Sequence, residues 1–377
     1  MKKKIIICTI TILIMCLLFI SLKKESQYIE TENFILSLSL DGKGITSFPS
    51  GKNYRVEVSC EGAIGVWDPV DWKLLVEEID GDTICNIDFY TRSNNDLLAN
   101  IVQNNAYYTK RNNDEIDAGY RYSGEEVNNY INFNNESWRI IGYVPVKNES
   151  GNITNLVKII RNQSIGTLAY DAKSSGFTNV WGNNTLYTLL NSYYYGREDG
   201  TETEYCYTNY GYYDYKAKGK CNYTNIGISS DQSDYYGNMI EKVYWNTGAS
   251  SSSVTPGESY KEEITNQSVS AYIGIISASD FGYAISEKYH DTAMKTADGS
   301  LTITNWLTGY YGWTNTPSNS STGKILLQHQ NIYDCSNGSN GCEAKYGYAV
   351  RPVVYLDSSI YVVSGNGSEL YPYQLSM

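Results

Sequence analysis

Two apolar stretches in the middle of the chain, WRIIGYV at residues 138–144 and LVKIIR at residues 156–161, decide the fold. Each is rich in β-branched and aromatic residues over a short length, which is typical of buried β-strands. Arg139 lies inside the first stretch, and Arg351 lies in a similar stretch near the C-terminus. Because a charged side chain is seldom buried without a partner, each arginine is expected to meet a carboxylate. The larger part of the chain is therefore predicted to contain a β-sheet.

Further stretches of this kind extend the larger unit over residues 120–377, with helix-like stretches between them. Apolar residues recur at helical spacing, so this unit is predicted to be an α+β domain. Residues 197–232 and 246–268 are rich in glycine, serine, tyrosine and threonine, which predicts two long surface insertions. The other expected strands are Tyr272–Ile276, Ile325–Leu327, Tyr348–Leu356 and Ile360–Val363, and the expected helices are Asn184–Tyr194, Asp234–Trp245 and Phe281–Lys288.

A smaller, all-β domain is predicted over residues 34–92. Tyr54, Val56 and Val58 alternate with polar residues, as in a strand that buries one face. Turns rich in glycine and aspartate separate this stretch from the apolar stretches that follow it. Residues 93–119 are polar and rich in asparagine, and they are expected to form a linker between the two domains.

Six cysteines follow the N-terminal segment and fall into three local pairs. Six cysteines permit fifteen connectivities, and proximity along the chain favours the local one. Disulfides persist only in an oxidising compartment, so the chain is expected to be exported. No C-x-x-C motif is present, and neither a zinc ribbon nor a thioredoxin-type site is predicted. The expected disulfides are Cys60–Cys85, Cys206–Cys221 and Cys335–Cys342.

The N-terminal segment, residues 1–24, has three lysines before an uninterrupted apolar run from Ile5 to Leu22. As a helix this run would rise about 27 Å, close to the ~30 Å of a bilayer's hydrocarbon core. It is predicted to be an uncleaved signal anchor, a single transmembrane helix at residues 5–22. The excess of lysine at its start places the N-terminus in the cytoplasm and the C-terminal ectodomain outside the cell membrane. A cleaved signal peptide is the alternative.

The charge balance excludes several classes of function. The 377 residues include 41 acidic and 29 basic ones, a formal net charge of −12, whereas nucleic-acid binders are normally basic. Only two histidines are present, and no metalloprotease, nucleophile-elbow, P-loop or dinucleotide-binding motif occurs. The sequence therefore predicts no nucleic-acid partner, no metal, no cofactor and no catalytic residue. Two distant carboxylates could still converge as in a glycosidase.

Several motifs follow one another in order: FNNESWRIIG at residues 133–142, IISASDFGYA at 275–284, NWL at 305–307, YAVRPVVYL at 348–356 and SGNGS at 364–368. In this order they resemble an uncharacterised surface-protein domain of low-GC Gram-positive bacteria, which would cover residues 120–377. More distantly, the early W-R-I strand and the late R-P strand resemble the C-type-lectin and formylglycine-generating-enzyme group of folds. The resemblance implies a bacterial surface protein with a lectin-like domain, and it assigns no activity, because fold alone does not fix function.

Tyrosine is the most unusual feature of the composition, with 37 Tyr against 7 Phe. Binding surfaces favour tyrosine for its large amphipathic contact area, although exposed strand positions also carry it. The segment NWLTGYYGWTN at residues 305–315 mixes aromatic rings with amides, as sugar-binding clefts do. Trp306 is expected in the core, and the predicted ligand-binding residues are Tyr310, Tyr311, Trp313 and Asn315.

Together these features predict a membrane-anchored, extracellular recognition or adhesion protein without catalytic activity. Its expected partners are a cell-surface glycan or protein ligand and the membrane, the latter through residues 5–22. Two alternatives stay open. One is a hydrolase of cell-envelope glycans, and the other is a structural spacer protein of the envelope.

Overall fold

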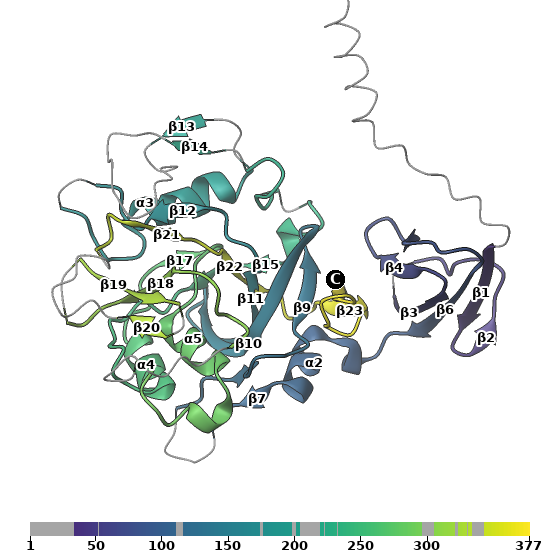
Figure 1. Ribbon diagram of the computed structural model, residues 1–377, viewed down its shortest axis with the longest axis horizontal. Coiled ribbons are helices and arrows are strands. Elements are labelled where there is room, and N and C mark those ends of the chain that lie inside the picture. Colours follow the sequence, from purple (N-terminus) through teal and green to yellow (C-terminus); the bar gives the residue numbers. More distant parts are fainter. Residues whose placement is uncertain are drawn as a thin grey trace, which may run out of the picture.

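The computed structural model describes residues 34–51, 53–110, 116–173, 176–197, 201–203, 219–221, 223–231, 233–295, 305–320, 323–329, 331–333 and 343–377. They form a small unit with strands β1 to β6 and a larger unit that holds the later elements (Figure 1). Strand β23 and the C-terminus lie on the side of the larger unit that faces the small one (Figure 1).

The small unit is a four-stranded sheet in the order β2-β1-β6-β3, with the hairpin β4–β5 beside it. β1 runs parallel to β6, and β3 runs antiparallel to it. Val56, Ile87 and Phe89 point to one face, where they bury Trp67 together with Val363 of the larger unit. The two units therefore share one apolar cluster. The strands are β1 (Phe34–Leu40), β2 (Lys43–Gly44), β3 (Tyr54–Glu61), β4 (Ile64–Asp68), β5 (Lys73–Glu77) and β6 (Thr83–Thr91).

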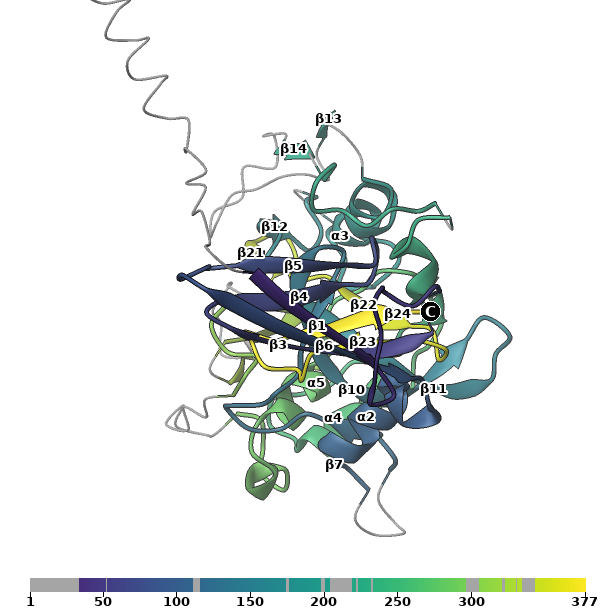
Figure 2. The same cartoon turned by 90° about the vertical axis from the view of Figure 1, so that its right-hand side faces the viewer.

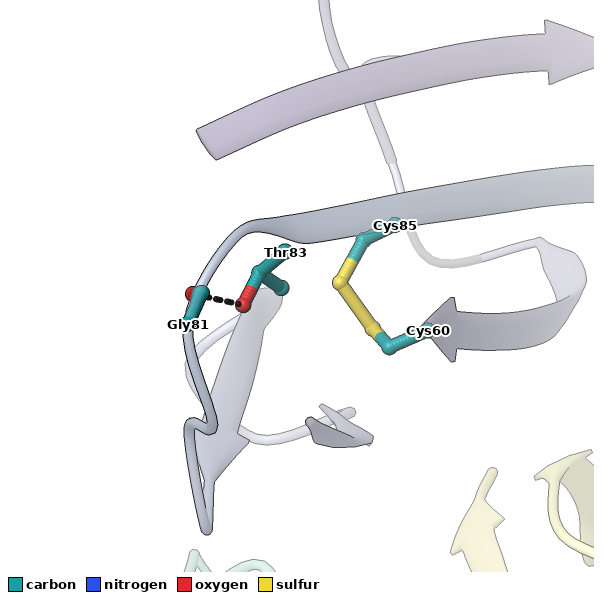
Figure 3. The surroundings of a disulfide bond; sticks show 4 residues. All are labelled: Cys60, Gly81, Thr83 and Cys85. Carbon is teal, nitrogen blue, oxygen red and sulfur yellow. Dashed lines mark hydrogen bonds between the residues drawn. A yellow bond between two sulfur atoms is a disulfide. The ribbon is translucent and has the colours of Figure 1, made fainter. Parts of the chain in front are cut away.

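The disulfide expected between Cys60 and Cys85 is confirmed (Figure 3). The two residues are register partners on β3 and β6, with Cα atoms 4.1 Å apart. The expected pairs Cys206–Cys221 and Cys335–Cys342 involve side chains outside the described residues.

The larger unit is organised around an eleven-stranded sheet whose central strands β10 and β11 pair antiparallel. They contain the two stretches WRIIGYV and LVKIIR, and Trp138, Ile140 and Ile159 are fully buried there. The strands of this sheet are β7 (Tyr107–Tyr108), β8 (Tyr120–Arg121), β9 (Tyr130–Phe133), β10 (Glu136–Asn148), β11 (Ile153–Arg161), β15 (Ile240–Glu241), β16 (Val243–Tyr244), β17 (Ser270–Ala271), β22 (Val353–Leu356), β23 (Tyr361–Ser364) and β24 (Tyr373–Ser376).

A second sheet of five strands, in the order β12-β21-β18-β19-β20, shares one hydrophobic core with the first. Its strands are β12 (Thr167–Ala169), β18 (Gly312–Pro317), β19 (Ile325–Gln328), β20 (Ile332–Tyr333) and β21 (Gly347–Ala349), and a separate hairpin joins β13 (Thr201–Thr203) to β14 (Gly219–Cys221). The helical segments are η1 (Asn94–Asp96), α2 (Leu98–Asn105), α3 (Thr185–Thr188), η2 (Leu189–Tyr194), η4 (Gly237–Met239), α4 (Pro256–Glu263), α5 (Ala278–Ala284) and η5 (Glu287–Tyr289).

Two expected elements of the larger unit are wrong. Asp234–Trp245 forms the short turn η4 and the strands β15 and β16 instead of a helix. Ile240 and Val243 are β-branched and pair with the edges of β22 and β10, so tertiary pairing outweighs their helical spacing. Tyr272–Ile276 is not a strand, because the ladder ends at Ala271 and only Gly274 makes an isolated bridge, to Val353.

Residues 246–268 are also not a surface insertion. Ser250 and Ser252 are buried, and α4 begins at an N-cap Thr255 whose hydroxyl accepts from the backbone of the helix. At the end of α4 the carboxylate of Glu263 is buried and hydrogen-bonded. Small polar side chains can enter a core when their hydrogen bonds are satisfied, which composition alone does not reveal.

The predicted fold class, a transmembrane helix followed by an all-β domain and an α+β lectin-like domain, is wrong. The described part of the chain is mostly β-sheet, and its longest helices, α2 and α4, have eight residues each. Within these residues no helix is both long and apolar enough to cross a membrane. This finding contradicts the expected single-pass localisation, and the segment 5–22 itself lies outside the described residues.

A buried ionic cluster connects the eleven-stranded sheet to α5. One carboxylate oxygen of Asp280 on α5 accepts from Arg121 of β8, and the other lies 2.5 Å from Nζ of Lys158 of β11. All three side chains are almost fully buried. Burial by itself raises the pKa of Asp280, but the charges of Lys158 and Arg121 outweigh it and hold the pKa well below its usual range.

Candidate anion-binding site

The structure separates the four residues predicted to bind ligand. Tyr310 is half-buried and Tyr311 is 42% exposed, whereas Trp313 and Asn315 are 2% and 1% exposed. Trp313 and Asn315 are therefore not at the surface, and the ligand-binding role of the four residues stays a prediction. Both belong to β18, which lies between β21 and β19 and whose six residues are all buried.

Trp313 and Asn315 have structural hydrogen bonds instead. The indole Nε1 of Trp313 donates to the carbonyl of Leu168 at 2.8 Å. The side-chain amide of Asn315 donates to the carbonyl of Asn246 at 3.2 Å. These bonds join β18 to neighbouring segments, so the two side chains hold the fold together.

Tyr310 and Tyr311 lie at the surface, next to different partners. The hydroxyl of Tyr310 donates to the side-chain amide oxygen of Gln163 at 2.7 Å, and its ring centroid is 5.5 Å from the guanidinium carbon of Arg351. Tyr311 stacks on His329, with ring centroids 3.8 Å apart and the planes 7° from parallel. Tyr310 therefore lies beside a charged group.

Arg351 is a buried cation that has no carboxylate partner in the part of the chain that the structure describes. It is 6% exposed, and its Nε donates to the carbonyl of Arg161 at 2.9 Å while Nη1 donates to that of Leu307 at 3.4 Å. Among the described residues no ion pair includes Arg351, so the expectation of a carboxylate is wrong. Burial lowers the pKa of Arg351 to about 10, and the charges of Arg139 and Arg161 act in the same direction.

Arg139 of β10 is in the same situation. It is 6% exposed, its Nε donates to the side-chain oxygen of Asn129, and its Nη2 donates to the carbonyl of Val127 at 3.4 Å. Its guanidinium carbon lies 3.7 Å from the ring centroid of Tyr130 and 5.0 Å from that of Trp306. No ion pair in the described part of the chain includes Arg139, so here too the expected carboxylate partner is wrong.

Arg161 is the neutralised member of this arginine cluster, which we define as Arg139, Arg161 and Arg351. Its Nε and Nη2 donate to the two carboxylate oxygens of Glu136, each at 2.8 Å. Such a two-pronged pair is the strong form of an arginine–carboxylate contact. The exposed Glu369 raises the pKa of Arg139 through space without forming an ion pair. Two of the three charges are therefore left without a counter-ion from the described residues.

The uncompensated charges define what the cluster can do. A buried cation is costly unless charge or dipoles stabilise it, and the rings of Tyr130, Trp306 and Tyr310 with the backbone carbonyls offset part of that cost. Nη2 of Arg351 donates to no acceptor among the described residues. The site is thus suited to an anion that approaches Arg351 beside the ring of Tyr310.

The sequence contained a signal for only part of this site. Asn134 and Asn135 have positive φ and form the turn between β9 and β10, a residue pair typical of tight hairpins. The register of that hairpin places Tyr130 opposite Arg139, so this contact was predictable. Arg351 comes from a segment far along the chain, and no local pattern points to its place beside the hairpin.

Carboxyl pairs bear on the hydrolase alternative. Glu241 and Asp357 lie near each other, and each shifts the pKa of the other. Glu263 and Asp280 are buried, and protein groups bind both carboxylates. In the described residues no group of three or more His, Cys, Asp or Glu side chains could hold a metal ion.

The Glu241–Asp357 pair predicts a specific pH dependence of stability. Burial raises the pKa of Glu241 from about 4.5 to about 7, and the hydrogen bond to Asp357 acts in the same direction. Because the folded state then binds this proton more tightly than the unfolded state, the contribution to stability is complete below pH 4.5 and is lost as the pH rises through 7. We expect the wild type to lose stability relative to Glu241→Gln over this window.

Urea unfolding of both proteins between pH 4.5 and 8 measures this difference. Glu77→Gln, at an exposed end of β5, is the control for the exchange of a glutamate for a glutamine. A difference for Glu241→Gln that stays constant over the window would contradict the prediction.

Comparison of the chain with protein-family models, with curated proteins and with solved structures finds no match. The resemblance of residues 120–377 to a bacterial surface-protein domain therefore stays a prediction.

Proposed function

We propose that this chain is a non-catalytic recognition protein that binds an acidic glycan at the arginine cluster. One observation carries the proposal: Arg139 and Arg351 are each 6% exposed and have no carboxylate partner among the described residues. A carboxylate on the ligand would supply the missing negative charge. Because the whole chain carries a net charge of −12, it repels anions at long range, and binding would depend on this local site.

The aromatic groups beside the cluster favour a sugar over a simple ion. Tyr310 is half-buried next to Arg351, and its hydroxyl is held by Gln163. An apolar sugar face packs on such a ring, while neighbouring amides and hydroxyls bond the sugar hydroxyls. We expect a uronic-acid sugar to direct its carboxylate toward Nη2 of Arg351 and its ring face toward Tyr310.

Arg351→Met is expected to weaken binding of an acidic oligosaccharide about 10- to 100-fold. This range corresponds to the ~1.5–3 kcal/mol of a hydrogen bond to a charged group. Isothermal titration with an oligosaccharide of alternating glucuronic acid and N-acetylglucosamine measures the loss. Reduction of the sugar carboxyl groups to alcohols should weaken binding to the wild type by a similar factor.

Lys242→Met is the matched control, because it also removes one positive charge, from a surface pair with Glu149 at 2.8 Å. It should leave the affinity within twofold. Arg351→Met removes an uncompensated charge and is expected to fold, and Arg351→Lys should retain part of the binding because it keeps the charge. Equal affinity for the acidic and the reduced sugar, or no binding of either, would refute the proposal.

A further inference from the structure

The small sheet has an open edge along β3. In the order β2-β1-β6-β3, strand β3 pairs with β6 alone, and the hairpin β4–β5 pairs only within itself. Outside its ladder with β6, β3 makes no backbone hydrogen bond to any other part of the chain that the structure describes. Within the described residues one row of β3 peptide groups is therefore unpaired, and β4 and β23 pack close to the strand.

The register shows which peptide groups face outward. Neighbours on antiparallel strands alternate between hydrogen-bonded pairs about 5.5 Å apart and non-bonded pairs about 4.5 Å apart. The Cα atoms of Cys60 and Cys85 are 4.1 Å apart, so theirs is a non-bonded pair. Residues an odd number of positions from Cys60 should then form hydrogen-bonded pairs with the neighbouring strand. In agreement, the amide of Arg92 donates to the carbonyl of Asn53, seven residues before Cys60. The residues that direct N–H and C=O away from β6 are therefore Tyr54, Val56, Val58 and Cys60.

A groove of about 430 Å³ follows this edge, between the small unit and the end of the larger one. Residues 55–59, five in a row, line it. Consecutive strand residues point to opposite faces, so a hollow that touches all five runs along the edge of the strand. Val362 and Ser364 of β23 contribute to its other side. Figure 2 views the molecule from the side of the small unit, where β3 and β23 lie.

Trp67 brings an unpaired donor to the same groove. It lines the groove and is 1% exposed, and its indole Nε1 has no hydrogen-bond partner among the described residues. A buried N–H without an acceptor is unfavourable, so an acceptor from a ligand would be stabilising. The backbone carbonyl of a bound peptide is an acceptor of this kind.

The charges at the groove indicate which side chain the ligand carries. Glu57 and Asp88 line it and lie directly opposite each other on β3 and β6, an unfavourable arrangement of like charges. Arg55 forms an ion pair with Glu57, and Asp88 accepts a hydrogen bond from Ser39. Asp88 takes part in no ion pair within the described ranges, and a cation beside it would be favourable.

We infer that this groove binds an extended segment of another polypeptide, which adds to β3 as a further strand and places a lysine or arginine beside Asp88. The outward peptide groups of Val56 and Val58 would supply the backbone hydrogen bonds of strand addition. Residues 55–59 span about 16 Å at ~3.3 Å per residue, which accommodates about five residues of ligand. This site is independent of the arginine cluster.

The test uses the full chain and an acetylated and amidated peptide of sequence TVKVT at millimolar concentration. Amide hydrogen exchange by NMR should slow at least tenfold at Val56 and Val58 when the peptide is bound. Methylation of the peptide's backbone nitrogens, and replacement of its lysine by glutamate, should each weaken binding at least tenfold. These two control peptides separate backbone pairing from charge.

Variants of the protein test the two other contacts. Asp88→Asn should weaken binding of TVKVT about tenfold, and Trp67→Phe, which removes the indole N–H together with part of the buried ring, about fivefold. Asp82→Asn, an exposed acid of the same unit outside the groove, should leave it within twofold. Equal binding of the methylated or glutamate peptide would overturn the inference. Protection of Val56 and Val58 by a concentration-dependent dimer without peptide would assign the edge to a second copy of the chain and would also overturn it.

Discussion

Asp280→Asn is expected to lower the free energy of unfolding by about 3–5 kcal/mol, because it leaves two buried cations without their counter-ion. The side chains of Arg121 and Lys158 are 3% and 6% exposed, and both bind the same carboxylate. Asparagine keeps the size of the side chain, removes its charge and replaces one acceptor oxygen by an NH2 donor. Urea unfolding at pH 7, followed by circular dichroism, measures the loss.

The same carboxylate predicts a loss of stability in acid. The pKa of Asp280 is depressed in the folded state, so its contribution is complete above the unfolded-state pKa of about 3.8 and is lost as the pH falls below it. In Asp280→Asn this part of the acid sensitivity should be absent. Adding Lys158→Met to Asp280→Asn should restore part of the stability, since one of the unpaired cations is then removed.

Asp231→Asn serves as the control, because Asp231 is an exposed acid that bonds only within its own turn. Its effect should stay within about 0.5 kcal/mol. A loss of less than about 1 kcal/mol for Asp280→Asn would show that the cluster does not stabilise the fold as its burial implies.

The local part of this cluster was predictable, but its partners were not. A helix was expected at Phe281–Lys288, and α5 lies one turn earlier because Ser277, not Ser279, is the N-cap. Helix capping is a contact between residues that are close in the sequence, so the start of a helix can be predicted from the sequence to within a few residues. Asp280 lies 122 residues from Lys158 and 159 from Arg121, and no local pattern reports contacts over such separations.

In the arginine cluster too, the sequence predicted that the side chains are buried but not which groups they contact. The apolar stretches around Arg139 and Arg351 correctly indicated buried arginines. Carboxylate partners were expected because most buried arginines have them. Arg351 instead donates hydrogen bonds to the backbone carbonyls of Arg161 and Leu307, which lie 190 and 44 residues away in the sequence. The pattern of apolar residues thus predicted β10 and β11. The candidate site is marked by two buried arginines that lack the usual carboxylate partner among the described residues, and only the folded structure shows this.

Replacement of both Cys60 and Cys85 by alanine is expected to destabilise the small unit by about 3 kcal/mol. The disulfide closes a loop of 25 residues, and the loss of chain entropy that it imposes on the unfolded state gives this magnitude. The buried core of this unit has few members, among them Val56, Ile87 and Phe89, so the cross-link supplies a large share of its stability. The larger unit has its own extensive core and should unfold separately.

Urea unfolding followed by NMR resolves the two units, with the indole signals of Trp67 and Trp72 reporting on the small one and that of Trp245 on the large one. In the double variant the small-unit signals should be lost at lower urea concentration, while that of Trp245 changes little. Reduction of the wild type should shift the small-unit signals in the same way and should not shift them further in the variant, because the variant no longer has this bond. If the Trp67 and Trp245 signals moved together, the shared cluster around Val363 would couple the units into one cooperative structure, and the disulfide would then stabilise the whole chain instead of the small sheet alone.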